Sequence, residues 1–569
     1  MSPFSRRDLL KAGTTLTAAL ALNPLTGCSD PEPSDVTELD VKFVTMMLAG
    51  YKVRLRTYGG TIPGPTLKTK PCAQLAIRIR NELPPYDSSA WHHGLKGLPE
   101  MAHMNVPHML NTTNLHVHGL EVVPHLFEPV GTSDPSSQMI AIDPGQDKLY
   151  TFTLPEDHPT GLYWYHPHHH GSTAVQVQNG MAGALIVEGA IDQVPEIAAA
   201  QQHVIAIQDI GLFESAKEPG LWSYDPQQNA IYSTGTGKSF IKDAQGNDKE
   251  PVDSGFSTGD FPLRLFLVNG QPVFQETHNP VPPQPNQQPK PIGSQLDDGP
   301  RYTLRPGEVV RFRMLNGCSD NLIPLVVEGH TMQLIAMDGV NFTAPRPRPY
   351  VPDAVDGQEQ VLLAPGGRAE FLIKASSTPG IYRIRQLAQS QQFLESAGKI
   401  LAEIEISGEP MDMALPTSLP EPKRHYPLIR PDEVQNHRSI TFDMMYPAEM
   451  NKVVGIDFGI NGEMYDETAV PIEVKLGAVE EWTIQDNGHA HGGSAEGHPF
   501  HIHTNSFEVI SIGDKPVEPG TLHDTVWVPH NTPVRIRIRF KEWTGKIVFH
   551  CHIIPHEDSG MMQNLMLRP

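Results

Sequence analysis

Histidines gather in four short clusters, and within each cluster they recur at a spacing suited to metal binding. The clusters are His116-Val117-His118, His166-Pro167-His168, His498-Pro499-Phe500-His501-Ile502-His503 and His550-Cys551-His552. On a β-strand, residues i and i+2 point to the same face, so each His-X-His pair offers two imidazoles to one site. One such pair is a weak signal, because polar residues also alternate on exposed strands. Four pairs in one chain predict a metal cluster.

The last cluster adds a sulfur ligand. Cys551 lies between two histidines, and the alternation of a strand turns its thiol to the face opposite theirs. His556 and Met561 follow closely. A thiolate with histidines and a weak axial thioether is typical of a blue copper electron-transfer site, whereas structural zinc takes four closed N/S ligands. The pattern therefore predicts copper on both faces of one strand.

The strands that position these clusters belong to a repeated unit. Residues 71–81, 306–316 and 476–486 each combine a turn with apolar residues at every second position, which predicts a half-buried strand. A second turn and strand follow in each copy. A third strand begins at Gly161, Gly380 and Gly545. Many alternating strands joined by short turns predict an all-β fold of β-sandwiches.

We expect three domains, at residues 36–190, 200–410 and 430–569, and only the first and the third hold histidine clusters. A chain of 569 residues suits about three domains. The 54 Pro and 48 Gly residues fit many turns. The Pro- and Gln-rich residues 279–300 are expected to form a solvated loop of domain 2.

Charge and cysteine content exclude several classes of protein. The formal net charge of −22 argues against nucleic acid or an anionic membrane surface as a partner and favours small molecules and metal cations. Four cysteines are too few for a disulfide-framed scaffold. Cys72 and Cys318 are either a disulfide or two buried thiols.

Residues 1–28 are expected to be an export segment. Residues 5–11 resemble a twin-arginine signal, and a short apolar run follows. Residues 25–28 resemble a bacterial lipobox, which would make Cys28 a lipid attachment point; an ordinary signal peptide that contains a cysteine is the alternative. We expect a periplasmic or cell-surface protein whose contact with a membrane is limited to that anchor.

From about residue 40 to the C-terminus, the four clusters together resemble those of three-domain multicopper oxidases of the bacterial laccase and cuprous oxidase group. The resemblance implies three cupredoxin-like Greek-key β-sandwich domains. It also implies four copper ions, one of type 1, one of type 2 and a type 3 pair. The implied activity is one-electron oxidation of a reducing substrate coupled to the four-electron reduction of dioxygen to water.

The resemblance also assigns the ligands. The type 1 copper would take His498, Cys551, His556 and Met561. The type 2 copper would take His116 and His501, and the type 3 pair would take His118, His166 and His552 on one ion and His168, His503 and His550 on the other. The trinuclear cluster would then lie between domains 1 and 3, with domain 2 as a spacer. We expect His169 and His170 to contact ligands or to lie at the surface.

Reduction of dioxygen consumes protons, so acids are expected beside the cluster. Glu557 matches a position that relays protons in the family. Asp134 is a second candidate, near type 2, although an Asp in this Gly-Thr-Ser-Asp segment also suits a turn cap. Electrons are expected to enter near an exposed edge of His556 and to cross Cys551 to its flanking histidines.

Two substrate classes remain open. A laccase-like enzyme would oxidise phenols or aromatic amines, which need an open, partly apolar face. A cuprous oxidase would need thioethers near type 1, and candidates are Met444, Met445, Met450 and Met464. The chain lacks the long Met-rich insertion of the better-known cuprous oxidases, which favours the laccase. A non-catalytic relative and a two-domain nitrite reductase are disfavoured by the complete ligand set and the length.

One further group of soft ligands is unexplained. The domain 1 segment from residue 92 to residue 109 carries seven residues that could bind copper: His92, His93, Met101, His103, Met104, His108 and Met109. It is either an ordinary loop or an additional copper-binding loop.

Overall fold

The computed structural model describes residues 35–86, 105, 108–215, 218–224, 261–277, 292–351, 361–391, 394–425, 427–445, 457–486 and 497–569. Four sequence predictions fall wholly or largely outside these residues: the export segment with Cys28, the greater part of the loop from His92 to Met109, any role of Met450, and the Pro- and Gln-rich loop at 279–300, of which only 292–300 are described. Within the described part, no helix has the length and apolar character needed to cross a membrane.

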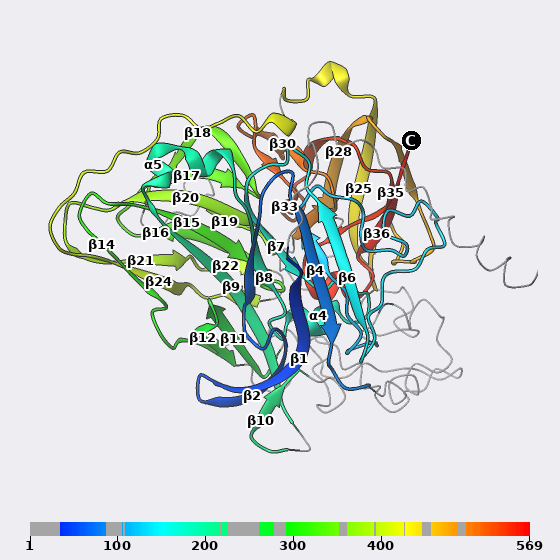
Figure 1. The fold of residues 1–569 in the computed structure, drawn as a ribbon, viewed down its shortest axis with the longest axis horizontal. Coiled ribbons are helices and arrows are strands. Elements are labelled where there is room, and N and C mark those ends of the chain that lie inside the picture. The colour runs from blue at the N-terminus through cyan, green and yellow to red at the C-terminus, as the bar shows by residue number, and fades with distance from the viewer. Residues whose placement is uncertain are drawn as a thin grey trace, which may run out of the picture.

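The described chain is nearly all β, as predicted, and its strands group into three units, each with strands in two larger sheets, one of which is shared by the first two units. In Figure 1, the green strands of the second unit lie to the left of the blue and cyan strands of the first, and the orange and red strands of the third overlap the first unit in the view and extend to its right. The alternation that predicted the strands also builds the core, because β4 (Gln74–Asn81) buries Leu75, Ile77 and Ile79 between the sheets of the first unit.

The first unit places the His-X-His strand on its smaller sheet. That sheet has the order β3 (Gly64–Thr69), β8 (Gly183–Val187), β7 (Gly161–His166), β5 (His116–His118). The facing sheet contains β2 (Tyr51–Tyr58), β1 (Thr37–Leu48), β4 and β6 (Asp147–Thr153). The short helix α4 (Thr173–Val177) follows β7 and is buried throughout.

The second unit pairs two sheets around the largest core cluster. One sheet has the order β14 (Arg301–Leu304), β24 (Lys399–Ile406), β21 (Gly380–Gln386), β16 (Ile323–Val327), β19 (Val361–Leu363). The other runs β18 (Val340–Arg348), β17 (Met332–Met337), β20 (Arg368–Lys374), β15 (Val309–Asn316), β9 (Gln201–Glu214). Beside β9, the same sheet also contains β11 (Leu263–Val268), β12 (Gln271–Thr277) and β13 (Ile292–Gln295). A separate two-stranded sheet consists of β22 (Gln389–Gln391) and β23 (Leu394–Ser396), and α5 (Pro195–Ala198) is a short helix that precedes β9.

The first two units share a sheet, which the sequence did not predict. The short strand β10 (Leu221–Ser223) pairs with β9 of the second unit on one side and with β2 of the first on the other. One 13-stranded sheet therefore continues from the second unit into the first.

The third unit has two sheets of its own. One contains β26 (Asp457–Ile460), β25 (Asn436–Met445), β28 (Val479–Asp486), β34 (Val534–Arg539), β30 (Phe507–Ile512), β31 (Lys515–Pro516) and β32 (Leu522–His523). The other has the order β27 (Ile472–Lys475), β36 (Met562–Arg568), β35 (Gly545–Cys551), β29 (His498–Ile502), β33 (Thr525–Val528). Helix α6 (Ile554–Asp558) follows β35.

The structure shows whether Cys72 and Cys318 form a disulfide. Cys318 and Cys551 are free, buried thiols, so Cys72 and Cys318 do not form a disulfide.

Candidate metal centre

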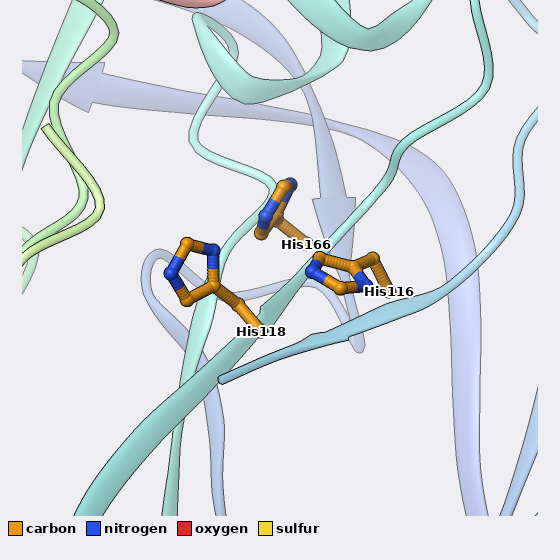
Figure 2. Close-up of side chains that lie close together, drawn as sticks. All are labelled: His116, His118 and His166. Atoms are coloured by element: carbon orange, nitrogen blue, oxygen red, sulfur yellow. The ribbon is translucent and has the colours of Figure 1, made fainter. Parts of the chain in front are cut away.

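Domain 1 gathers its histidines on two adjacent strands. β5 pairs antiparallel with β7, and this pairing sets His116 opposite His166. Strand alternation sends Val117 into the core and turns His116 and His118 to one face. The three rings surround a common space in Figure 2, and each offers a nitrogen within 4.8 Å of the others.

Domain 3 contributes the facing half in the same way. β29 pairs with β35, and His501 lies opposite His550. The two halves meet ring to ring: His116 stacks on His503, and His118 stacks on His501, each with 3.9 Å between ring centroids. The predicted cluster between domains 1 and 3 is therefore present as one buried group.

The ring nitrogen atoms of this group converge on common points. The Nε2 atoms of His168 and His503 lie 3.1 and 3.3 Å from Nε2 of His550. On the other side, Nδ1 of His118 lies 3.3 Å from Nε2 of His552. Neutral imidazoles that turn ring nitrogens toward common points in a buried site form an arrangement that can bind a metal cation.

Backbone carbonyls fix which nitrogen faces inward. The Nδ1 atoms of His166, His501 and His550 lie 2.9, 2.8 and 2.9 Å from the carbonyl oxygens of Pro167, Asp524 and Cys551. Each Nδ1–H donates to its carbonyl, so each Nε2 keeps a lone pair, as is usual for metal-binding histidines. Burial, reinforced by the neighbouring histidines, lowers the pKa of the cluster members His116 and His118 well below the usual value. Neutral imidazole is the form that binds metal.

A second group lies on the opposite face of β35. Sγ of Cys551 is 3.5 Å from Nδ1 of His498 and 3.9 Å from Nδ1 of His556, and all three residues are buried. The backbone N–H of Ile553 donates to this sulfur at 3.4 Å, which stabilises a thiolate. The donor set of one thiolate and two imidazoles suits copper.

Met561 is buried beside this second group. Its carbonyl accepts from the backbone N–H of Cys551 at 3.1 Å, and its own N–H donates to the carbonyl of His556 at 2.9 Å. The backbone therefore holds the predicted axial residue next to two predicted ligands, and its side chain belongs to the same core cluster as Cys551.

The expected exposed edge of His556 is absent. The ring is 2 % exposed, and Phe458 stacks on it with 4.4 Å between centroids. Phe458 comes from β26, far from His556 in sequence, so local patterns could not predict this cover. Electrons would have to enter through such covering side chains.

The two predicted acids differ in position. Glu557 is buried on α6, where its carboxylate oxygens lie 3.3 Å from Nδ1 of His168 and 3.2 Å from Nδ1 of His550. Burial, and then the neighbouring Asp558, raises the pKa of Glu557 well above its usual value. Burial therefore favours the protonated form of Glu557, which lies in contact with two histidines of the cluster.

Asp134 is not part of the cluster, and the prediction that it supplies a second acid is wrong. Its carboxylate is exposed and accepts from the backbone N–H of Ser136 at 2.9 Å and from its hydroxyl at 2.8 Å. These bonds lower the pKa of Asp134. The residue caps a turn, which is the alternative role of an Asp in such a segment.

Several residues near the cluster were not predicted from the sequence. Asp524 lies 3.1 Å from Nε2 of His118, and Nε2 of His125 lies 3.2 Å from Nδ1 of His116. Neither belongs to a motif. Asp558 follows Glu557 directly and could have been noticed; burial raises its pKa to about 7.

His169 and His170 are buried and belong to neither group of nitrogens. Nε2 of His170 lies 3.1 Å from the side-chain oxygen of Asn105, and its Nδ1 lies 3.6 Å from Asp558. His170 therefore joins the buried polar group around Asp558, and neither histidine belongs to the metal-binding groups.

The chain is similar to known proteins along most of its length. Family models described as multicopper oxidase match residues 101–191, 240–402 and 430–569. A multicopper oxidase of Mycobacterium tuberculosis is 24% identical over 537 residues, which cover 91% of this chain and 84% of that protein. A laccase of Bacillus stratosphericus is 24% identical over 539 residues, with 90% of each chain covered.

Solved structures show the same fold. A multicopper oxidase of Campylobacter jejuni, described as a metallo-oxidase, superposes with a TM-score of 0.63 at 22% identity and covers 95% of this chain and 96% of its own. A laccase-like multicopper oxidase of Ochrobactrum sp. gives 0.63 at 19% identity and covers 95% of this chain and 99% of its own.

Proposed function

The chain belongs to the multicopper oxidase family, and from that premise we propose that it is a laccase-like enzyme, which oxidises phenols or aromatic amines in one-electron steps and reduces dioxygen to water. The observation that carries this proposal is the position of Cys551, whose thiol belongs to one group of ligands while the histidines on either side of it belong to the other.

We propose four copper ions on these two groups. The type 1 ion would be held by His498, Cys551, His556 and Met561. The type 2 ion would be held by His116 and His501, and the type 3 pair by His118, His166 and His552 and by His168, His503 and His550. Copper bound in this way supplies the one-electron carriers and the oxygen-reducing centre. The convergence of His168, His503 and His550 on one point supports one of these sets.

The protein itself provides the path between the two groups. Cys551 is covalently joined to His550 and His552, so a few bonds separate the sulfur from imidazoles of the cluster. β35 is fully buried, which keeps water away from this path.

Glu557 is proposed to hold and deliver protons. It contacts a ligand histidine from each half of the cluster, and burial, which raises its pKa, favours the protonated carboxyl group. A buried acid in this position can donate when oxygen is reduced and can be recharged afterwards.

The described surroundings of the type 1 group favour an organic donor over Cu(I). Met444 is buried in the core of domain 3, and Phe458 covers His556 with an aromatic face. Relatives of this chain include both laccases and a copper resistance protein of Escherichia coli, so cuprous oxidase activity is the second candidate function.

The loop between His92 and Met109 offers the test. We expect a variant with Met101, Met104 and Met109 all replaced by Leu to keep phenol turnover within about threefold, or under ~1 kcal/mol of barrier, since Leu preserves apolar volume. Steady-state rates with phenols and with Cu(I) should be measured side by side. If Cu(I) oxidation falls tenfold or more while phenol oxidation stays intact, the enzyme is a cuprous oxidase.

We also propose export through the twin-arginine-type segment and lipid attachment at Cys28, because residues 5–11 and 25–28 carry both signals. Cell fractionation and the mass of the mature N-terminal peptide test this. Replacement of Cys28 by Ser should release the protein from membranes without changing its oxidase activity.

A further inference from the structure

Domain 2 reaches the histidine cluster through one buried side chain. Arg368 begins β20 and has no exposed surface. Its guanidinium donates to both carboxylate oxygens of Asp524, with Nη1–Oδ1 at 2.7 Å and Nη2–Oδ2 at 2.5 Å. Its Nε also donates to the carbonyl of Leu162 at 3.2 Å. One residue of domain 2 thus bonds to domain 1 and to domain 3.

Asp524 connects this guanidinium to the proposed copper ligands. Its Oδ1 accepts from Nε2 of His118 at 3.1 Å, and its backbone carbonyl accepts from Nδ1 of His501 at 2.8 Å. His118 comes from domain 1 and His501 from domain 3, and their rings stack at 3.9 Å. Asp524 therefore orders one ligand from each half of the cluster.

The bond to Asp524 sets the tautomer of His118. A carboxylate accepts the Nε2 hydrogen, so the lone pair of His118 lies on Nδ1, the atom that faces Nε2 of His552 at 3.3 Å. His166, His501 and His550 have the opposite arrangement, because carbonyl oxygens occupy their Nδ1 atoms. His118 differs from these three because its partner is a side chain, which can turn.

The surrounding residues keep that side chain from turning. The backbone N–H of Arg368 donates to Oδ1 of Asp338 at 2.8 Å, and the other oxygen of Asp338 lies 2.7 Å from Nδ1 of His523. His523 directly precedes Asp524 in the chain. Domain 2 thus holds Asp524 at its carboxylate and, through Asp338, at the neighbouring residue.

The backbone of domain 2 also lies against the cluster at Gly366. A Cβ added to this residue, which has a φ of +83°, would lie 2.8 Å from Nε2 of His552. The turn that carries Arg368 is therefore in direct contact with a proposed ligand.

We propose that Arg368 is a positioning residue for the trinuclear cluster, which acts through Asp524 to hold His118 and His501 in the orientation that binds copper. The proposal rests on the copper assignment made above. It gives domain 2, which lacks copper ligands among its described residues, a direct part in the oxygen-reducing centre.

The test compares Arg368→Met and Arg368→Lys with Arg311→Met. Arg311 is a matched control, because it is also unexposed, lies on the neighbouring strand β15 and is ion-paired, with Glu370 and Asp192. Each holoprotein is characterised by copper content, by its blue absorption and near-ultraviolet type 3 absorption, and by the type 2 signal in electron paramagnetic resonance.

We expect Arg368→Met to weaken copper binding at the cluster about 10- to 100-fold, the usual cost of removing a partner of a metal ligand. Its type 2 and type 3 signals should change while the blue absorption from Cys551 remains. Arg368→Lys keeps the charge without the bidentate geometry, so it should show a smaller change of the same kind. Arg311→Met should keep all signals.

The double variant Arg368→Met/Asp524→Asn separates positioning from general stability. If Arg368 acts through Asp524, the double variant should lose no more cluster copper than the more affected single variant. Wild-type cluster signals that persist in both Arg368 variants would overturn the inference, as would equal loss of the blue and the cluster signals. A wild-type protein that binds copper without type 2 and type 3 signals would instead refute the proposed function.

Discussion

The two proposed copper sites share the strand β35 but differ in how the fold builds them. His498, Cys551 and His556 all come from domain 3, and backbone hydrogen bonds hold Met561 beside them. The histidine cluster instead takes half its proposed ligands from domain 1, on β5 and β7 or directly after β7, and half from domain 3, on β29 and β35 or directly after them. Domain 3 alone therefore forms the proposed electron-entry site, whereas the proposed oxygen-reducing site requires domains 1 and 3 together.

The largest effect is expected from Cys551→Ser. Cys551 is the proposed type 1 ligand that lies on the shared strand β35, and this change removes its thiolate. A hydroxyl cannot give the thiolate-to-copper charge transfer, so the blue absorption should vanish. Substrate oxidation should fall at least about 1,000-fold, or ~4 kcal/mol. Absorption spectra and oxygen uptake check both.

The flanking histidines should still bind copper in Cys551→Ser, so near-ultraviolet type 3 absorption should survive. If that absorption disappears together with the blue band, copper binding at the histidine cluster depends on Cys551, and the two sites do not bind copper independently. An intensely blue variant would show that Cys551 is not the type 1 ligand.

A smaller effect, confined to the cluster, is expected from Glu557→Gln. The amide fills the same space beside His168 and His550 but carries no exchangeable acid, so turnover should fall about 100-fold. Anaerobic bleaching of the blue band by substrate should keep its rate, because electron entry does not use Glu557. Stopped-flow reduction and steady-state oxygen uptake separate the two steps.

Asp134→Asn is the matched control for that experiment, since this exposed carboxylate only caps a turn. Its turnover should stay within about twofold, or under ~0.5 kcal/mol. A hundredfold loss here would mean that Asp134 takes part in proton delivery after all.

The smallest effect is expected from Met561→Leu, which alters only the proposed type 1 site. Loss of a weak axial donor destabilises Cu(II) more than Cu(I), so the redox potential should rise while the blue copper stays bound. Turnover of an easily oxidised phenol should change by less than about tenfold, or ~1.4 kcal/mol. A redox titration that shows an unchanged or lower potential would exclude Met561 as the axial ligand.

The sequence predicted what depends on local alternation. A strand fixes the direction of i and i+2 side chains, so His116, His118 and the reversed face of Cys551 followed from spacing alone. The repeat likewise predicted β4, β15 and β28. These features need no knowledge of how distant segments pack.

The contacts between distant segments could not be predicted. Arg368 and Asp524 are 156 residues apart, and neither lies in a motif. The same limit explains the two errors: Phe458 covers His556 from another strand, and the segment that carries Asp134 folds back on itself at the surface. Side-chain partners set by tertiary packing leave no periodic trace in one sequence.

The sheet that continues through β9, β10 and β2 determines how the molecule would come apart. Domains 1 and 2 are joined by backbone hydrogen bonds, whereas among the described residues no strand of domain 3 enters that sheet. Partial opening should therefore separate domain 3 from the other two as a unit. That step divides the histidine cluster and leaves the Cys551 site whole. Amide hydrogen exchange in domains 1 and 2 should thus have a common opening energy, and on heating the cluster should release copper while the protein is still blue.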